Sequence, residues 1–205
     1  MTPWQTLGFV LGAAFASGLN LYATIGVLGL LHRFEVVRLP GSLDVLAHPV
    51  VLGVALTLYV IEFVADKIPY VDNIWDVVHT FIRPPAAAVL AYTALGTGDV
   101  PDAVRLVAAM VAGTVALASH GAKASTRTAV NASPEPASNT AVSLTEDGLA
   151  IFLVWMAVTH PLLTTVLVGV LLVVSVWLMV KILGSVGRAL RRLFRPRPRP
   201  LAPSS

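Results

Sequence analysis

Five acidic or imidazole side chains between residues 62 and 79 have a spacing that could form a binding site. Glu62 and Asp66 are four residues apart, so a helix would place both carboxylates on one face. Two carboxylates this close repel each other when both are ionised, which suits the capture of a proton or a cation. Beyond a proline, the same spacing returns at Asp72, Asp76 and His79. Carboxylates with an imidazole can ligate a divalent cation, so this second set also predicts a cation site.

The alternative is that these residues form a wetted surface. Asp66 precedes Lys67, and such a pair is typical of charge at a membrane interface. The set of Asp72, Asp76 and His79 would then lie on the exposed face of a surface helix. Glu62 fits this alternative less well because it follows a long uncharged run. An ionisable residue inside a membrane is costly and indicates function.

A basic set, His120, Lys123 and Arg127, lies on one face of a predicted helix because its members are three and four residues apart. Their charge complements the acidic residues, so a pair between Lys123 and either Glu62 or Asp66 is expected. The same cations could instead meet an anionic substrate. In the alternative, they are ordinary cytoplasmic charge at the end of a helix.

Polar residues at two interruptions of the apolar sequence complete the predicted site. The sequence around Pro134 and Pro136 cannot be regular helix, so residues 133–139 are expected to re-enter the membrane or to form a turn. This segment and its flank contribute Asn131, Glu135, Ser138 and Asn139. In the first apolar run, Asn20 follows Ser17 and Gly18, which predicts a break facing the bundle interior. A hydrogen bond between helices is the alternative role for Asn20.

The elements that must position these residues are membrane-spanning helices. Of the 205 residues, 56% are hydrophobic and 12% are charged, whereas a soluble domain carries about 25% charged residues. The absence of cysteine excludes disulfides, thiol catalysis and Cys-ligated metals. No Walker loop, dinucleotide fingerprint, HExxH motif or Gly-x-Ser-x-Gly motif occurs. The composition therefore predicts an all-α, polytopic transmembrane helix bundle.

Apolar runs predict about six spans, with one or two broken or re-entrant segments. The second polar stretch, 66–83, could be an amphipathic or re-entrant piece, and the short third run must borrow residues from it. The last long run is divided at His160–Pro161. The predicted runs are Leu7–Leu31, Pro49–Ala65, Pro84–Gly98, Ala103–Ser119, and two helices within Gly148–Val180.

Basic residues predict the orientation and the tail. Seven of the 14 basic residues lie between Lys181 and Arg199. We therefore divide the chain into a transmembrane domain, 1–183, and a basic, disordered cytoplasmic tail, 184–205. This tail is expected to bind anionic lipid headgroups rather than nucleic acid. Counting Arg83, Lys123 and Arg127 as cytoplasmic predicts both termini in the cytoplasm of a cell (inner) membrane protein.

The motifs together resemble a known group of membrane proteins. They are Ala16–Asn20, Glu62–Pro69 with Asp72 and His79, and the segment from Lys123 to Asn139. With these motifs, the chain resembles the family catalogued as domain of unknown function 4126, from about residue 8 to residue 180. The resemblance implies a multi-pass membrane protein and brings no activity or established site residue with it.

Three functions are compatible with the sequence. The leading hypothesis is a small transporter or channel for an ion or a small polar solute, with no cofactor. The second is a membrane-embedded enzyme acting on a lipid-linked phosphate, in which the acids and His79 would hold a divalent cation. The third is a structural membrane subunit. The glycine-rich first run, which includes Gly8 and Gly12, would permit a homo-oligomer.

Overall fold

Helices in the computed structural model, which describes residues 1–68, 70–96, 100–131 and 135–193, begin mostly at prolines or polar capping residues. Proline suits the first helical turn because its missing N–H has no partner there. No strand occurs among these described residues, which confirms the all-α prediction. The elements are α1 (Pro3–Leu19), α2 (Leu21–Arg33), the 3₁₀ helix η1 (Leu43–Ala47), α3 (Pro49–Ala65), α4 (Val71–Ala94), α5 (Asp102–Asn131), α6 (Pro136–Thr159) and α7 (Pro161–Leu193).

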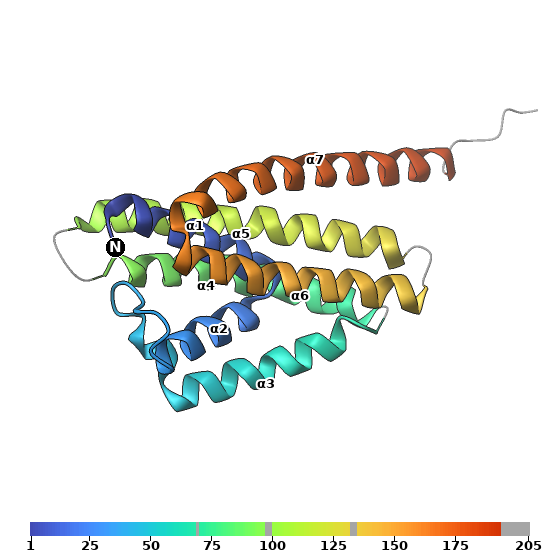
Figure 1. The fold of residues 1–205 in the computed structure, drawn as a ribbon. Coiled ribbons are helices and arrows are strands. Elements are labelled where there is room, and N and C mark those ends of the chain that lie inside the picture. Colours follow the sequence, from blue (N-terminus) through green and yellow to red (C-terminus); the bar gives the residue numbers. More distant parts are fainter. Residues whose placement is uncertain (69, 97–99, 132–134, 194–205) are drawn as a thin grey trace, which may run out of the picture.

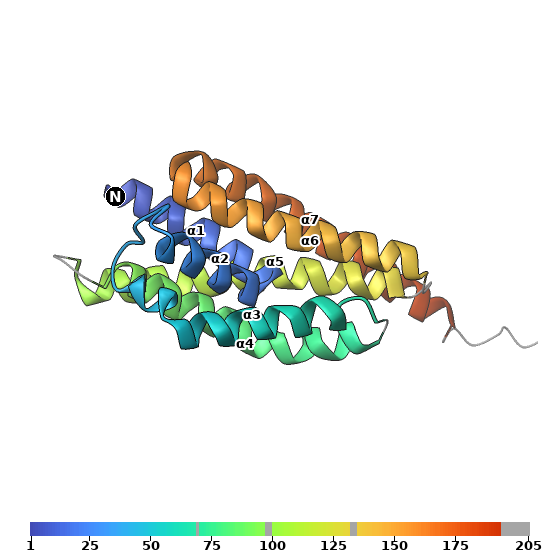
Figure 2. The same ribbon diagram turned by 60° about the horizontal axis from the view of Figure 1, so that its bottom comes forward.

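A single extended residue, Asn20, turns the first apolar run into a helical hairpin. Its backbone has φ −150° and ψ 103°, so it ends α1 and begins α2. Figures 1 and 2 both show α1 entering the bundle from one end and α2 returning to that end. The predicted break at Asn20 is confirmed, but the prediction that Leu7–Leu31 forms one span is wrong. The broken segment of this fold is the α1–α2 hairpin.

The helices α3 to α7 run between the two ends of the bundle in alternating directions (Figure 1). The hairpin makes no net crossing, so the start of α1 and the end of α7 lie at opposite ends of the bundle. We call the end of the bundle near the last turns of α7 the tail end. This arrangement does not favour the prediction that both termini lie on one side of the membrane, because the hairpin returns to the end of the bundle from which α1 starts.

Small residues allow α1 to lie at the centre of the bundle, where it packs against α4, α5, α6 and α7. Every α1 residue from Gly12 to Leu19 is buried. A Cβ at Gly18 would collide with the Ser119 hydroxyl and the Ala116 carbonyl of α5. Close approach of backbones is the way helices gain packing contacts in lipid. The glycine and alanine residues of α1 therefore set how deeply the tip of the hairpin lies between the other helices.

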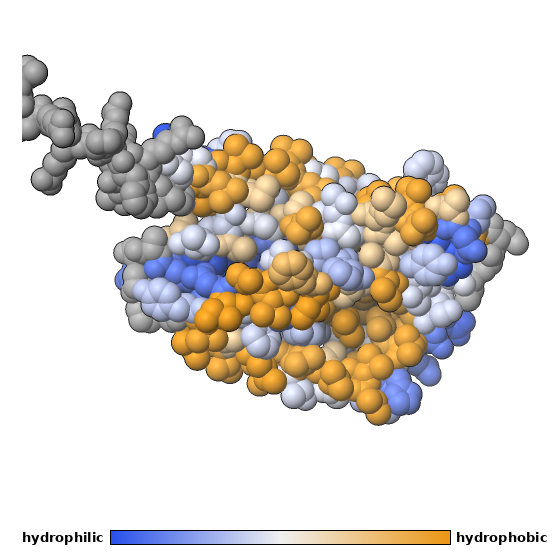
Figure 3. All heavy atoms as spheres, turned by 180° about the vertical axis from the view of Figure 1, so that it is seen from behind, coloured by the Kyte–Doolittle hydropathy of each residue, from blue (hydrophilic) through white to orange (hydrophobic). Residues whose placement is uncertain are grey.

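The outer surface has the character of a membrane protein. Three helical segments among the described residues are long and apolar enough to cross a membrane: Asp102–Asn131, Ala137–Thr159 and Pro161–Ser185. The shorter α3 is also apolar. Figure 3 shows apolar residues over much of the middle of one face, with hydrophilic residues gathered toward the ends. Six spans are plausible by length, although the hairpin replaces the first of them.

Several helix boundaries agree with the predicted ones, and one helix continues beyond its predicted end. As predicted, the third apolar run forms one helix with the polar residues before it, because α4 is continuous across Pro84 and Pro85. The fifth span likewise begins early, at Pro136, and the division at His160 is confirmed. Helix α7 continues past residue 183 to Leu193, into the segment assigned to the tail. Residues 132–134 and 194–205 lie outside the described residues, so re-entry of the 133–139 segment and disorder of the remaining tail stay predictions.

Candidate functional site

Charged side chains from four helices meet inside the bundle beside the tip of the α1–α2 hairpin. We call this set the ionic cluster. Its cations are Arg83, Lys123 and Arg127, and none of the three side chains is exposed. Its carboxylates and amides, which are buried except for the slightly exposed Glu146, are Glu62, Asp66, Asp72, Asp76, Glu146, Asp147, Asn20, Asn131 and Asn139. Buried charges need partners, so the pairing of these groups decides what the cluster can bind.

The half of the cluster nearest the middle of the bundle is built around Glu62. One of its oxygens, Oε1, is ion-paired with Arg83 Nη2 and lies 3.5 Å from Lys123 Nζ. Both cations also bind the unwound end of α1. Arg83 Nη1 donates to the Gly18 carbonyl at 2.8 Å, and Lys123 Nζ donates to the Leu19 carbonyl at 3.2 Å. The last turn of a helix has carbonyls without intrahelical donors, so these contacts satisfy the end of α1.

The half nearest the tail end is built around Arg127. Its Nε and Nη2 donate to Glu146 Oε2 at 3.0 and 2.6 Å, and Nη2 also lies 3.3 Å from Asp66 Oδ2. Its Nη1 donates to the Asp66 carbonyl and to Asn139 Oδ1. Asp66 in turn accepts from Lys123 Nζ at 2.7 Å. The predicted pair between Lys123 and the two acids thus exists.

Asp66 lies just beyond the last residue of α3, and its neighbours keep it ionised. Burial raises the pKa of its carboxyl, but the charges of Lys123 and Arg127 outweigh burial and hold the pKa below its ordinary value. Asp66 therefore connects two cations on α5.

His120 must be neutral in this arrangement. Its Nδ1 lies 2.8 Å from Arg83 Nη1, and a guanidinium only donates, so Nδ1 accepts. The proton is then on Nε2, which lies 3.0 Å from the Asp76 carbonyl and 2.9 Å from the Thr80 hydroxyl. The prediction that His120 adds positive charge to the basic set is corrected, because a doubly protonated ring could not accept from Arg83.

Asp72 and His79 have partners of their own within the bundle. Asn131 Nδ2 donates to both oxygens of Asp72, at 2.9 and 2.8 Å. His79 Nδ1 lies 2.8 Å from the Trp75 carbonyl, which can only accept, so Nδ1 carries the proton. His79 Nε2 then accepts from the Tyr22 hydroxyl of α2 at 3.1 Å. These contacts connect α4 to α5 and to the hairpin.

Asn20 joins the hairpin to α6. Its side-chain Oδ1 accepts from the Ala23 amide at 2.8 Å and so caps α2. Its Nδ2 donates to Asp147 Oδ1 at 2.8 Å. Because Asn20 is also the residue at which α1 ends, one amide side chain fixes the tip of the hairpin and binds a carboxylate of the cluster.

The cations of the cluster are nearly saturated, whereas its carboxylates are not. Lys123 uses its three donors on Leu19, Glu62 and Asp66, and every donor atom of Arg127 is engaged. Among the described residues, the only donor atom of these cations without a partner is Arg83 Nε. The buried carboxylate oxygens that have no donor among the described residues are Glu62 Oε2, Asp66 Oδ1, Asp147 Oδ2 and both oxygens of Asp76.

The charges of the cluster are also unbalanced. Its six carboxylates face three cations, and Lys67 at its edge is the only further cation that lies against it among the described residues. Lys67 Nζ donates to the Phe63 carbonyl at 2.9 Å and lies 3.5 Å from the Ser143 hydroxyl. Burial lowers the pKa of Lys67, and the charges of Asp147 and Asp66 oppose that shift. With spare acceptors and excess negative charge, the cluster is suited to a positively charged ligand, not to an anion.

Most of the residues expected at a site do come together. Eleven belong to the cluster or contact it: Asn20, Glu62, Asp66, Asp72, Asp76, His79, His120, Lys123, Arg127, Asn131 and Asn139. Two do not. Glu135 is exposed at the start of α6, and Ser138 donates to the Glu135 carbonyl in the first turn of that helix.

Sequence reasoning missed four members of this region: Tyr22, Arg83, Glu146 and Asp147. Arg83 was counted as surface charge, although it lies seven residues from Asp76 on the same helical face. Asp147 follows Ser143 by four residues and shares its helical face, and both are buried. This pair of polar residues on one helical face could have indicated that α6 contributes to the site.

No group of three or more His, Asp or Glu side chains among the described residues has an arrangement that could hold a metal ion. Asp72, Asp76 and His79, which the sequence proposed as ligands of one cation, instead face Asn131, Arg83 and Tyr22 respectively. Each of the three side chains thus has a different partner, and their predicted role as ligands of one divalent cation stays a prediction.

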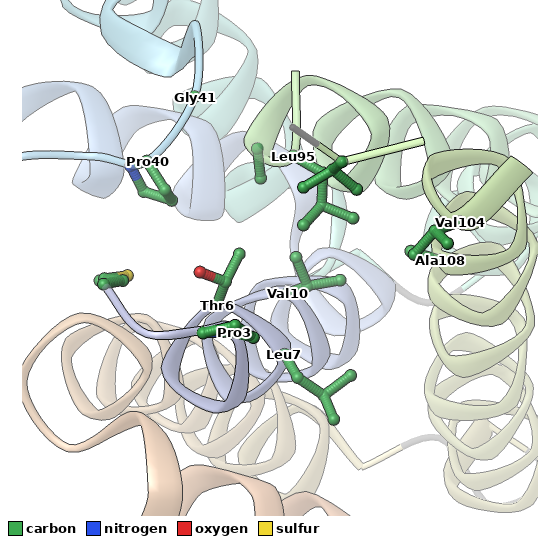
Figure 4. A pocket seen from close by; sticks show the side chains of 12 residues that line it. Pro3, Thr6, Leu7, Val10, Pro40, Gly41, Leu95, Val104 and Ala108 are labelled. Atoms are coloured by element: carbon green, nitrogen blue, oxygen red, sulfur yellow. The ribbon is translucent and has the colours of Figure 1, made fainter. Parts of the chain in front are cut away.

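A cavity of about 480 Å³ lies at the opposite end of the bundle from the tail. Figure 4 shows its lining from α1, the segment before η1, the end of α4 and α5, with Thr6, Val10, Pro40, Leu95 and Val104 among the labelled residues. The Thr6 hydroxyl already donates to the Thr2 carbonyl at 3.2 Å. The lining is mostly apolar and includes none of the cluster residues, so this cavity is separate from the candidate site.

Comparison with known proteins identifies the family without adding an activity. No curated protein and no solved structure matches the chain significantly. The pattern of one family matches residues 7–181, which include the whole ionic cluster and the tip of the hairpin. The chain therefore belongs to the family described as domain of unknown function 4126.

Proposed function

We propose that the protein is a small transporter or channel that moves a cation, with the proton included in that class, across the membrane. The observation that carries the proposal is the position of the ionic cluster at the broken tip of the α1–α2 hairpin. Gly18, Leu19 and Asn20 of the tip all bind charged side chains of the cluster. Broken helices beside buried charges are a common way to build ion sites in transporters. Ionisable residues in the membrane interior are costly, which supports a functional role.

The sign of the cargo follows from the hydrogen bonds. An anion would need free donors, and Lys123 and Arg127 have none left. A cation would need free acceptors, and the carboxylates provide them. The same saturation weighs against an enzyme acting on a phosphate, because the basic groups that would hold the phosphate are already bound to acids.

The proposed orientation places the tail end in the cytoplasm. Lys67 follows the end of α3, and Lys181 and Arg188 lie in the second half of α7, and both helices run toward this end (Figure 1); the sequence continues with further arginines. Arg33 ends α2, Arg38 follows it, and Arg105 lies in the first turn of α5, at the other end of the bundle (Figure 1). The positive-inside rule then gives a cytoplasmic C-terminus, where the basic residues would meet anionic lipid headgroups, and an N-terminus on the far side.

Flux measured in proteoliposomes tests the proposal. Protons, Na⁺ and K⁺ serve as the probe ions, each with an imposed gradient. Wild-type protein should carry at least one of them above the rate of empty liposomes, and Asp76→Asn should lower that flux to the empty-liposome rate. Asp76 is chosen because its carboxylate has no hydrogen bond to lose among the described residues.

Asp102→Asn is the matched control, because Asp102 is 82% exposed and lies at the far end of α5. Its flux should equal that of the wild type. Wild-type flux in Asp76→Asn, Glu62→Gln and Asp66→Asn would remove these acids from the mechanism, and the absence of flux for every probe ion would overturn the proposed function.

A further inference from the structure

The buried carboxylate of Asp76 is the least satisfied charged group of the cluster. The residue is 3% exposed, and neither of its oxygens has a hydrogen-bond donor among the described residues. Its nearest cation atom is Arg83 Nη1 at 3.9 Å, and that atom already donates to Gly18 and His120. A buried carboxylate without donors is unfavourable, so this position calls for a positively charged ligand.

The free oxygens are arranged for a ligand that needs few contacts. Hard metal cations take about six or more oxygen ligands in one shell. The described residues contain no group of three acidic or imidazole side chains that could provide such a shell. A proton needs one acceptor only, and Asp76 offers two oxygens.

From these observations we infer that the ion bound by the cluster is a proton and that Asp76 is its binding site. This inference rests on the proposed function for its role in transport, but the binding site can be tested by itself. A proton on either oxygen neutralises the carboxyl, removes part of the excess negative charge and leaves the ion pairs of Glu62 and Asp66 intact.

The groups around Asp76 agree with this assignment. On its own helix, Asp76 lies beside Arg83, and His120 of α5 contacts its backbone. The charges of Lys123 and Arg127 on α5, and of Asp66 at the end of α3, also act on its carboxyl. His120 Nε2 donates to the backbone carbonyl of Asp76, not to its side chain. Lys123 and Arg127 donate their hydrogen bonds to other acceptors, including Asp66 and Glu146, so neither cation donates to the Asp76 oxygens.

Infrared spectroscopy of the full-length protein in proteoliposomes tests the inference. A protonated carboxyl has a C=O stretching band that a carboxylate lacks. We expect wild-type protein to show this band and to lose it as the pH is raised, with no response to Na⁺ or K⁺ at constant pH. Asp76→Asn should remove the band, whereas Asp102→Asn should leave it unchanged. Asp76→Glu, which keeps a carboxyl, should restore a band at a shifted frequency.

The outcomes separate the two proposals. A wild type without the band, or a band that persists in folded Asp76→Asn protein, overturns the proton site. A band that responds to Na⁺ or K⁺ but not to pH also overturns it, in favour of a metal cation. If the band behaves as expected while no probe ion crosses the liposome membrane, the proton site stands and the transport function fails. Asp76→Glu keeps the test decisive if Asp76→Asn does not fold.

Discussion

At the scale of single residues, Arg127 shows how a buried charge is made tolerable. It donates charge-assisted hydrogen bonds to two carboxylates, Asp66 and Glu146, and to the neutral amide oxygen of Asn139. The planar guanidinium supplies donors in several directions, which a lysine ammonium could not do from the same position. The role of Arg127 is therefore to hold the ends of α3 and α6 against α5, rather than to await a ligand.

Replacing Arg127 by methionine should strongly destabilise the protein. The change leaves Glu146 without a hydrogen-bond donor and Asp66 with Lys123 as its remaining cation, and breaking a buried ion pair from one side costs about 3–5 kcal/mol. Arg127→Lys should recover part of the loss. The measurement is thermal unfolding in detergent, with Asp102→Asn as the exposed control that should unfold like the wild type. Equal unfolding temperatures for Arg127→Met and the wild type would contradict the structural role.

At the scale of elements, the hairpin is the feature that organises the bundle. Gly18 lets the tip approach α5, and Asn20 both caps α2 and binds Asp147 of α6. Tyr22, early in α2, reaches His79 of α4. The tip is thus joined to α4, α5 and α6 by specific polar contacts, so a movement of the tip would change the contacts of the cluster.

Asn20→Ala should cost more than the loss of an ordinary helix cap. A cap is worth about 0.5–2 kcal/mol, and leaving Asp147 without its donor adds about 1–3 kcal/mol. The matched control is Thr2→Ala, which removes the cap of the exposed end of α1 but leaves no buried carboxylate without its hydrogen-bond donor. Both variants can be compared by thermal unfolding in detergent. Equal losses would show that the contact with Asp147 contributes nothing to stability.

At the scale of the whole molecule, the hairpin determines the topology. It enters and leaves at one end, so the five helices α3 to α7 decide on which sides the termini lie. In the proposed orientation, an odd number of crossings separates the start of α1 from the end of α7, and the exposed cations toward the tail end, Lys181 and Arg188, lie on the cytoplasmic side.

Cysteine labelling should detect this arrangement, because the natural chain contains no cysteine. A membrane-impermeant maleimide added to intact cells should label Thr2→Cys from outside. It should label Ser185→Cys only after the membrane is opened. A Ser185→Cys protein labelled from outside together with Thr2→Cys would contradict opposite termini, and labelling of neither residue before opening would do the same.

The sequence by itself determined the membrane surroundings of the protein, its class of fold and most residues of the candidate site. Its apolar runs fixed the membrane as surroundings, because few polar residues remain to cover a water-facing surface. Helical spacing placed Glu62 with Asp66 and Lys123 with Arg127, since residues three and four apart share a face. Extended backbone at Asn20 was also foreseen, because a polar side chain beside small residues interrupts an apolar helix.

Only the tertiary structure decided the direction of the chain after Asn20 and the partners of each charge. A break in an apolar run can be a kink or a reversal, and the difference depends on whether other helices leave room for a hairpin tip, as α5 does at Gly18. Arg83 was counted as cytoplasmic charge and Asp147 was not singled out, because partners on other helices are not encoded by local spacing. The surplus of acceptors over donors, from which the cation and proton proposals follow, became visible only when those partners were known.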